Sequence, residues 1–191
     1  MDANSKDGTE EICNSYGIKY VKDDGRGKGS AMAIGVKLCK YNDILFYDAD
    51  GSHDPRDIPE FIRLLKETNV DMITASRRTG GSYDIDLSFG GLIRSTGCDF
   101  LTFLVNARYK VSLTDILYSF RAIRKNKFIE LGLVQPGFGV EQEMVMNAIE
   151  KKFNIIEIAS RENKRGWGQP KLKLITGLYF IWMILVKYLP K

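Results

Sequence analysis

The sequence has little histidine and little cysteine, which limits the chemistry open to it. His53 is its only histidine, and none of the three cysteines, Cys13, Cys39 and Cys98, has metal-ligand spacing. A cysteine nucleophile would have only His53 as an imidazole partner, so we do not expect a catalytic thiol. We interpret the cysteines as reduced packing residues in a cytoplasmic setting.

The chain also lacks a strong net charge and a membrane-spanning run. Its 28 basic and 24 acidic residues leave a net charge of +4, which is too small to indicate a nucleic-acid partner. That charge suits an anionic small molecule or an anionic membrane surface equally well. Residues 174–186 carry no charge, but a spanning helix needs about 20 apolar residues. No signal peptide is recognisable at the start of the sequence.

The composition and pattern are those of an α/β protein. The 191 residues are enough for one domain with a substantial core. Apolar strand-like runs alternate with helical segments through the first hundred residues, which predicts crossover units and a mainly parallel sheet flanked by helices. The predicted strands are 18–21, 43–47, 70–76 and 154–159. The later predicted helices are 90–109 and 140–152.

Two carboxylates, those of Asp48 and Asp50, come directly after the apolar run 43–47. Alternation along an extended chain directs Asp48 and Asp50 to the same side of the strand. The carboxyl end of such a strand is where ligands bind in a parallel α/β sheet. Paired carboxylates repel each other unless a cation lies between them, so this pattern predicts a divalent-metal and diphosphate site. The alternative is an ordinary polar loop, because Asp, Gly, Ser and Pro are common in turns.

A glycine-rich basic loop occupies residues 23–30. Its glycines would let the backbone approach phosphates closely, and Arg26 and Lys28 would supply positive charge. The loop lacks a complete P-loop or dinucleotide-binding pattern, so a plain turn remains the alternative. Further along, Arg121 is flanked by apolar residues, which suits either a surface side chain with a buried stem or an anion-binding role.

The C-terminal segment has a different character from the rest. Lysines flank the uncharged residues 174–186, and Tyr179, Trp182 and Tyr188 lie within or beside them. This pattern is typical of a helix at a membrane surface, and a core-packing helix is the alternative. We therefore divide the chain into a catalytic domain, 1–170, and an apolar, membrane-interfacial helix, 171–191.

Several motifs now resemble those of the inverting family 2 glycosyltransferases, and within them the polyprenyl-phosphate group typified by dolichol-phosphate mannosyltransferase. Residues 26–29 resemble the family's G-K-G loop, and Asp48-Ala49-Asp50 resembles its D-A-D triplet. Ser52 falls where the family often has a third polar group beside the metal. The remaining similar segments are Ser76-Arg77 (S-R), Arg94 (a helix arginine), Asp115 to Arg121 (D-x-x-S-G-F-R) and 165–172 (R-x-x-G-x-S-K-L).

The sequence departs from the family pattern in three places. Asp2 to Thr9 resembles a D-D-G-S-x-D-G-T segment, but Ala3 and Asn4 replace its second Asp and its Gly. Ser119 replaces the glycine before Phe-Arg. Family members also have an apolar strand before this region, and nothing upstream of Asp2 matches it. The resemblance therefore predicts a GT-A (Rossmann-like) domain that is N-terminally incomplete, without the first strand and its helix.

The resemblance implies transfer of a sugar from a GDP- or UDP-sugar to a polyprenyl (dolichyl) phosphate, with Mg²⁺ or Mn²⁺ as cofactor. By this resemblance Asp50, with Asp48 and Ser52, holds the metal. Asp2, Arg26, Lys28, Asp48 and Asp50 bind the donor. Arg77, Arg94 and Arg121 bind phosphate, and Asp115 acts as a base or orienting residue. Because the acceptor phosphate is already ionised, no strong general base is required.

Two other interpretations stay open at this point. A sugar nucleotidyltransferase would also combine an α/β sheet with metal-binding carboxylates, but it would not need the arginine series or the apolar C-terminal helix. An inactive, membrane-associated glycosyltransferase fragment would fit the missing first strand. For an active enzyme, we expect a cytoplasmic protein that is peripheral at the inner face of the membrane.

Overall fold

The structure, a computed structural model, describes residues 1–167 and 174–188. Its centre is a four-stranded sheet in the order β1-β3-β2-β4. The strands are β1 (Asp43–Phe46), β2 (Met72–Ser76), β3 (Arg121–Arg124) and β4 (Ile155–Ala159). β3 pairs antiparallel with both β1 and β2, whereas β4 pairs parallel with β2.

The sheet is therefore mixed, which corrects the prediction of a mainly parallel one. β1, β2 and β4 run in one direction, but β3 enters from the edge at which those three strands end. Its first residue, Arg121, lies opposite Phe46, the last residue of β1. The reason is that residues 110–120 lead from the preceding helix directly to this edge, so no crossover returns the chain to the other end of the sheet.

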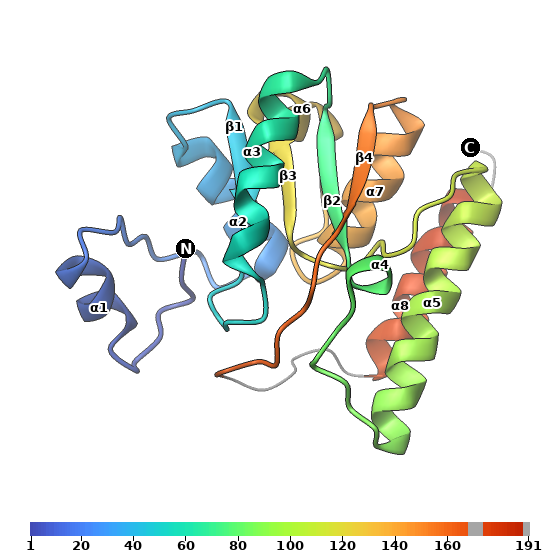
Figure 1. The fold of residues 1–191 in the computed structure, drawn as a ribbon, viewed down its shortest axis with the longest axis horizontal. Coiled ribbons are helices and arrows are strands. Elements are labelled where there is room, and N and C mark those ends of the chain that lie inside the picture. The colour runs from blue at the N-terminus through green and yellow to red at the C-terminus, as the bar shows by residue number, and fades with distance from the viewer. Residues whose placement is uncertain (168–173, 189–191) are drawn as a thin grey trace.

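Helices cover both faces of the sheet (Figure 1). On one face, α3 (Ile58–Glu67) buries Phe61, Leu64 and Leu65 against Ile73 and its neighbours. The other face is covered by five helices: α2 (Lys28–Leu38), α5 (Phe89–Tyr109), α6 (Lys125–Leu131), α7 (Val140–Glu150) and α8 (Leu174–Tyr188). Alternate strand residues point to opposite faces, so each strand contributes to both cores. The predicted α/β fold is confirmed.

Two short helical turns lie near the edge of the sheet where β1 and β2 end. The 3₁₀ turn η1 (Pro55–Asp57) leads into α3, and α4 (Arg77–Gly80) follows β2 directly. The side chain of Ser76 caps α4 by accepting hydrogen bonds from the backbone N–H groups of Arg78 and Thr79. These turns fix the positions of side chains that follow β1 and β2.

The C-terminal helix α8 lies beside α5 at one end of the molecule (Figure 1). One face of α8 buries Phe180, Met183 and Ile184 in the core. The other face leaves Leu178 and Trp182 more than half exposed. No helix among the described residues is long and apolar enough to cross a membrane.

The N-terminal segment differs from the prediction. Residues 18–21 do not form a strand, and only an isolated parallel bridge joins Asp2 to Lys22. One bridge does not make a ladder, because a strand needs successive backbone pairs. The short helix α1 (Thr9–Ser15) lies within this segment, to one side of the sheet (Figure 1).

Candidate functional site

Polar side chains gather at the edge of the sheet where β1 and β2 end and β3 begins. The antiparallel pairing of Phe46 with Arg121 brings the residues after β1 next to those before β3. Asp48 and Ser119 are thereby neighbours, although 71 residues separate them. This edge contains the predicted acidic pair, and it is built from segments far apart in the sequence.

Asp48 lies at the centre of a hydrogen-bonded chain. Its Oδ2 atom accepts from Lys28 Nζ at 3.0 Å and from Ser119 Oγ at 2.6 Å. Lys28 Nζ also lies 2.9 Å from Glu141 Oε1, on the first turn of α7. Burial opposes the charge of Lys28, but Glu141 and Asp48 outweigh it and raise the pKa of its ammonium group. Burial likewise opposes ionisation of Asp48, yet Lys28 and Ser119 lower the pKa of its carboxyl group.

The glycine-rich loop places Lys28 at this point. Gly27 adopts a φ of 119°, and a Cβ atom there would lie 2.9 Å from the carbonyl oxygen of Pro136. A side chain at Gly29 would overlap the carbonyl of Gln135. The loop therefore packs closely against residues 135–137, and only glycine permits that approach. Its glycines serve packing and orient Lys28 toward Asp48.

Asp50 lies in the turn that follows Asp48. Its Oδ1 atom accepts hydrogen bonds from the backbone N–H and the hydroxyl of Ser52, at 3.0 and 2.7 Å. Its Oδ2 atom lies 2.9 Å from Arg165. Ser52 is buried, so its hydroxyl supports the Asp50 carboxylate. Arg165 supplies a positive charge to the same carboxylate.

The donor set fits a cation that also binds substrate phosphates. No group of three or more His, Cys, Asp or Glu side chains able to hold a metal ion occurs in residues 1–167 and 174–188. Mg²⁺ commonly takes only one or two protein carboxylates and completes its shell with water and substrate phosphate. Asp48 and Asp50 provide such a pair.

Arg77 and Asp115 form an ion pair near the end of β2, in which Asp115 is buried and Arg77 is partly exposed. Nε and Nη2 of Arg77 lie 2.7 and 3.1 Å from the two oxygens of Asp115. Arg77 also lies 3.4 Å from Glu162 and 4.8 Å above the ring of Tyr118. Burial opposes ionisation of Asp115, but Arg77 outweighs it and lowers the pKa of the carboxyl group. Both oxygens of Asp115 accept hydrogen bonds from Arg77, an arrangement that suits the orienting role among the two predicted for Asp115.

Arg121 lies inside the protein and not on its surface. Its side chain is fully buried, and its guanidinium group donates to three backbone carbonyls, those of Tyr118, Glu141 and Ile116. Burial lowers the pKa of Arg121 to about 10. The alternative of a surface side chain is therefore wrong, whereas the phosphate-binding role of Arg121 stays a prediction. Arg121 joins the segment before β3 to α7.

Three further predicted residues are not joined to this cluster. Asp2 accepts hydrogen bonds from Ser5 and Tyr20 within the N-terminal segment. Arg26 is exposed and pairs with Asp24. Arg94 lies in α5, and its Nε atom is buried without a hydrogen-bond partner among the described residues. Their predicted roles remain predictions.

Sequence reasoning missed three residues that the fold adds to the site. Glu141 lies in the predicted helix 140–152 without an assigned role, His53 entered only as the one possible imidazole partner for a cysteine, and Ser119 only as the replacement of a family glycine. All three are buried. The available signal was polarity within otherwise apolar segments, since buried polar groups need partners.

The family relationship follows from comparison with known proteins. Residues 1–132 match the model of glycosyl transferase family 2. The chain belongs to glycosyl transferase family 2. It is therefore a glycosyltransferase, and the nucleotidyltransferase interpretation is excluded. Uncharacterized glycosyltransferases from Mycobacterium bovis and Mycobacterium tuberculosis are each 26% identical over 172 residues, covering 90% of this chain and 76% of theirs.

Solved structures agree with this family assignment at the level of the fold. Glucosyl-3-phosphoglycerate synthase from M. tuberculosis, in complex with Mn²⁺, UDP and phosphoglyceric acid, superposes with a TM-score of 0.71 at 17% identity, covering 100% of this chain and 67% of that one. Its complex with Mn²⁺, UDP-glucose and glycerol 3-phosphate gives 0.70 at 17% identity, covering 100% and 69%. The glycosyltransferase thus has the GT-A type of α/β fold.

Proposed function

We propose that this glycosyltransferase moves a sugar, with inversion, from a nucleotide-diphospho-sugar to the phosphate of a polyprenyl (dolichyl) lipid. The observation that supports a donor site is the ion pair between Lys28 and Asp48 at the edge of the sheet where β1 ends. Asp50 lies in the turn that follows Asp48. A lysine and a pair of carboxylates suit a diphosphate with its divalent cation. The donor is a GDP- or UDP-sugar.

Asp50, with Asp48 and Ser52, would hold Mg²⁺ or Mn²⁺. When bound, the ion neutralises charge on the departing diphosphate. Lys28 adds a second positive charge beside Asp48, and its buried partner Glu141 fixes the ammonium group in place. Support for this cofactor also comes from the structurally similar synthase, which was solved with Mn²⁺ and UDP.

The acceptor half of the proposal depends on how the candidate bases among the described residues are engaged. His53 has both ring nitrogens engaged, and Asp115 is held by Arg77. A phosphate acceptor is already ionised near neutral pH, so it needs orientation and charge compensation only. Arg94 and the partly exposed Arg77 are the arginines that we assign to the acceptor phosphate.

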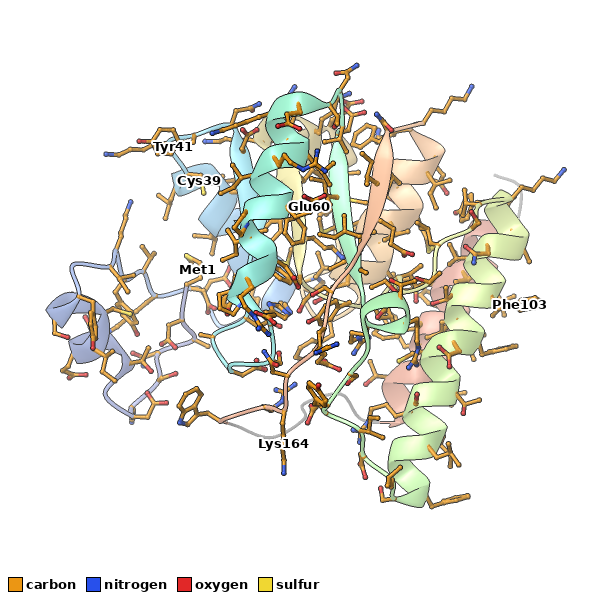
Figure 2. All side chains as sticks on the ribbon, viewed as in Figure 1. Met1, Cys39, Tyr41, Glu60, Phe103 and Lys164 are labelled. Carbon is orange, nitrogen blue, oxygen red and sulfur yellow. The ribbon has the colours of Figure 1, made fainter. Side chains whose placement is uncertain are left out.

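Apolar stripes on α5 and α8 support a lipid acceptor. On α5, Leu92, Phe100 and Phe103 are exposed at helical spacing. On α8, Leu178 and Trp182 are exposed in the same way. Figure 2 shows Phe103 pointing away from the sheet. Adjacent helices with such stripes suit a membrane surface. We place the protein peripherally at the inner, cytoplasmic face of the membrane, which its free cysteines favour.

A water-soluble phosphorylated acceptor is the second candidate. The structurally similar synthase was solved with phosphoglyceric acid, and its fold covers the whole of this chain. Such an acceptor would use the same arginines without a lipid. The two candidates differ in whether sugar transfer requires a polyprenyl chain.

Sugar transfer with defined acceptors tests the proposal. The purified chain is incubated with radiolabelled UDP-glucose or GDP-mannose and Mn²⁺, and with either polyprenyl phosphate in detergent or 3-phosphoglycerate. We expect labelled glycolipid that disappears with EDTA and in Asp50→Asn. Labelled phosphoglycerate instead would establish the second candidate. No product with any donor or acceptor would overturn both and favour the inactive fragment.

Membrane association is tested separately by flotation with phosphatidylcholine vesicles with and without phosphatidylglycerol. We expect the wild-type chain to float with the vesicles and the double variant Phe103→Ser/Trp182→Ser to stay behind. Tyr41→Ser is the matched control, because Tyr41 is 79% exposed but lies outside α5 and α8. Equal flotation of all three proteins would contradict a role for the stripes.

A further inference from the structure

His53 is enclosed by aromatic rings in the buried part of the site. Its ring stacks on Phe120 at 4.7 Å with an angle of 7° between the planes. The rings of Tyr47 and Tyr118 meet it edge-on at 5.2 and 5.1 Å. The imidazole therefore has one orientation, set by packing on three sides.

Both ring nitrogens of His53 are hydrogen-bonded, and the tautomer is fixed by which nitrogen accepts and which donates. Nδ1 lies 3.0 Å from the backbone nitrogen of Asp48 and accepts its N–H. The proton of the neutral ring must then reside on Nε2, which lies 3.1 Å from Ser119 Oγ. An imidazole that accepts a hydrogen bond at Nδ1 is neutral, so the hydrogen bonds themselves define the protonation state of the ring.

The hydroxyl of Ser119 links the His53 ring to the Asp48 carboxylate, and we call this chain of hydrogen bonds from His53 through Ser119 to Asp48 the connection. The hydroxyl accepts from Nε2 of His53 and donates its own proton to Asp48 Oδ2 at 2.6 Å. His53 thus holds Asp48 twice, through its backbone N–H and, by way of Ser119, through its carboxylate. Oδ1 of Asp48 has no hydrogen-bond partner among the described residues, and the side chain is 36% exposed. The rotamer fixed in this way keeps Oδ1 open to a ligand.

We propose that His53 and Ser119 are positioning residues that fix the Asp48 carboxylate, so that Oδ1 faces the bound donor and its cation. Neither residue touches substrate; both act through Asp48. Ser119 stands where the family pattern has a glycine, so this connection depends on a residue in which the chain departs from that pattern. The functional part of this inference rests on the proposed donor site.

The first test needs no substrate. His53 is the only histidine, so the imidazole ¹⁵N spectrum of the chain, prepared without a histidine tag, contains one pair of ring-nitrogen signals. We expect a neutral ring at pH about 7, with the proton on Nε2. Ser119→Ala should shift the Nε2 signal. A proton on Nδ1, a mixture of tautomers, or a spectrum unchanged by Ser119→Ala would overturn the connection.

The second test separates positioning from general stability. In Ser119→Ala and Ser119→Gly we expect the donor KM to rise about tenfold, equivalent to about 1.4 kcal/mol, with kcat changed much less. Ser119→Thr keeps the hydroxyl and should restore the wild-type KM. Tyr47→Phe is the matched control, because it removes a hydroxyl that donates to the His53 carbonyl and leaves the connection intact.

The outcomes of these two tests show separately whether the positioning role fails and whether the proposed function fails. If the wild-type chain transfers sugar but the Ser119 variants keep its donor KM, the positioning role is overturned while the proposed function stands. If the wild-type chain neither binds nor transfers any sugar nucleotide, the proposed function fails and the positioning role fails with it. The ¹⁵N spectrum still decides whether the connection itself exists.

Discussion

Lys28 and Asp48 form an ion pair with 3.0 Å between Nζ and Oδ2, although they belong to different structural elements. Lys28 belongs to the glycine-rich segment 23–30 and is the first residue of α2, and Asp48 follows β1. The lysine side chain is only 21% exposed and also contacts Glu141. The pair therefore connects the predicted phosphate loop to the predicted acidic edge, and the first prediction below depends on it.

Lys28→Met should weaken donor use strongly. The change removes the charge that faces Asp48 and leaves the Glu141 carboxylate buried without its cation, so we expect a loss in kcat/KM on the order of 100-fold. Steady-state transfer assays measure it. Lys37→Met, an exposed position in the last turn of the same helix, is the control and should behave like the wild-type chain. Equal losses in the two variants would show that the site does not use Lys28.

Arg165→Ala should strengthen binding of Mn²⁺ alone. Arg165 lies 2.9 Å from Asp50 Oδ2 and neutralises the carboxylate that the metal is proposed to bind. Its removal should raise Mn²⁺ affinity severalfold, measured by electron paramagnetic resonance of free Mn²⁺. Asp50→Asn should abolish this binding in either background. Unchanged affinity in Arg165→Ala would mean that the metal does not compete with this arginine.

His53 should make the folded state less stable as the pH falls. Burial lowers the pKa of His53 from 6.5 to about 4, so the unfolded state binds more protons between these values. The free energy of unfolding should therefore decrease below pH 6.5, by up to about 3 kcal/mol at pH 4. Urea unfolding at several pH values measures this dependence. His53→Gln lacks the titrating group and should lose that part of the dependence; an identical pH dependence in both proteins would contradict the burial argument.

Arg121→Lys should destabilise the fold, because a lysine cannot bond three separate carbonyls. Each buried carbonyl left without a donor costs about 1–3 kcal/mol, so we expect a loss on the order of 3 kcal/mol. Urea unfolding gives the value. Arg63→Lys changes an exposed arginine in α3 and should alter stability by less than about 0.5 kcal/mol. A normally stable Arg121→Lys chain without activity would instead support the predicted phosphate-binding role.

Local pattern was enough to place the main elements. The helix predicted for 90–109 corresponds to α5, and the strand predicted for 154–159 corresponds to β4. The apolar run before Asp48 is β1. These predictions succeeded because hydrophobic periodicity and turn chemistry act over a few residues. The glycine-rich loop and the acidic turn were recognisable for the same reason.

The direction of β3 and the buried polar contacts of the site depend on segments that are far apart in the sequence. The antiparallel entry of β3 places Ser119 beside Asp48, and α7 places Glu141 beside Lys28. Arg121 lies inside the protein because three carbonyls converge there. The sequence by itself determined the elements and the family motifs. Only the tertiary structure decided which polar groups meet, because burial pairs each one with whatever partner the packing of remote segments brings within reach.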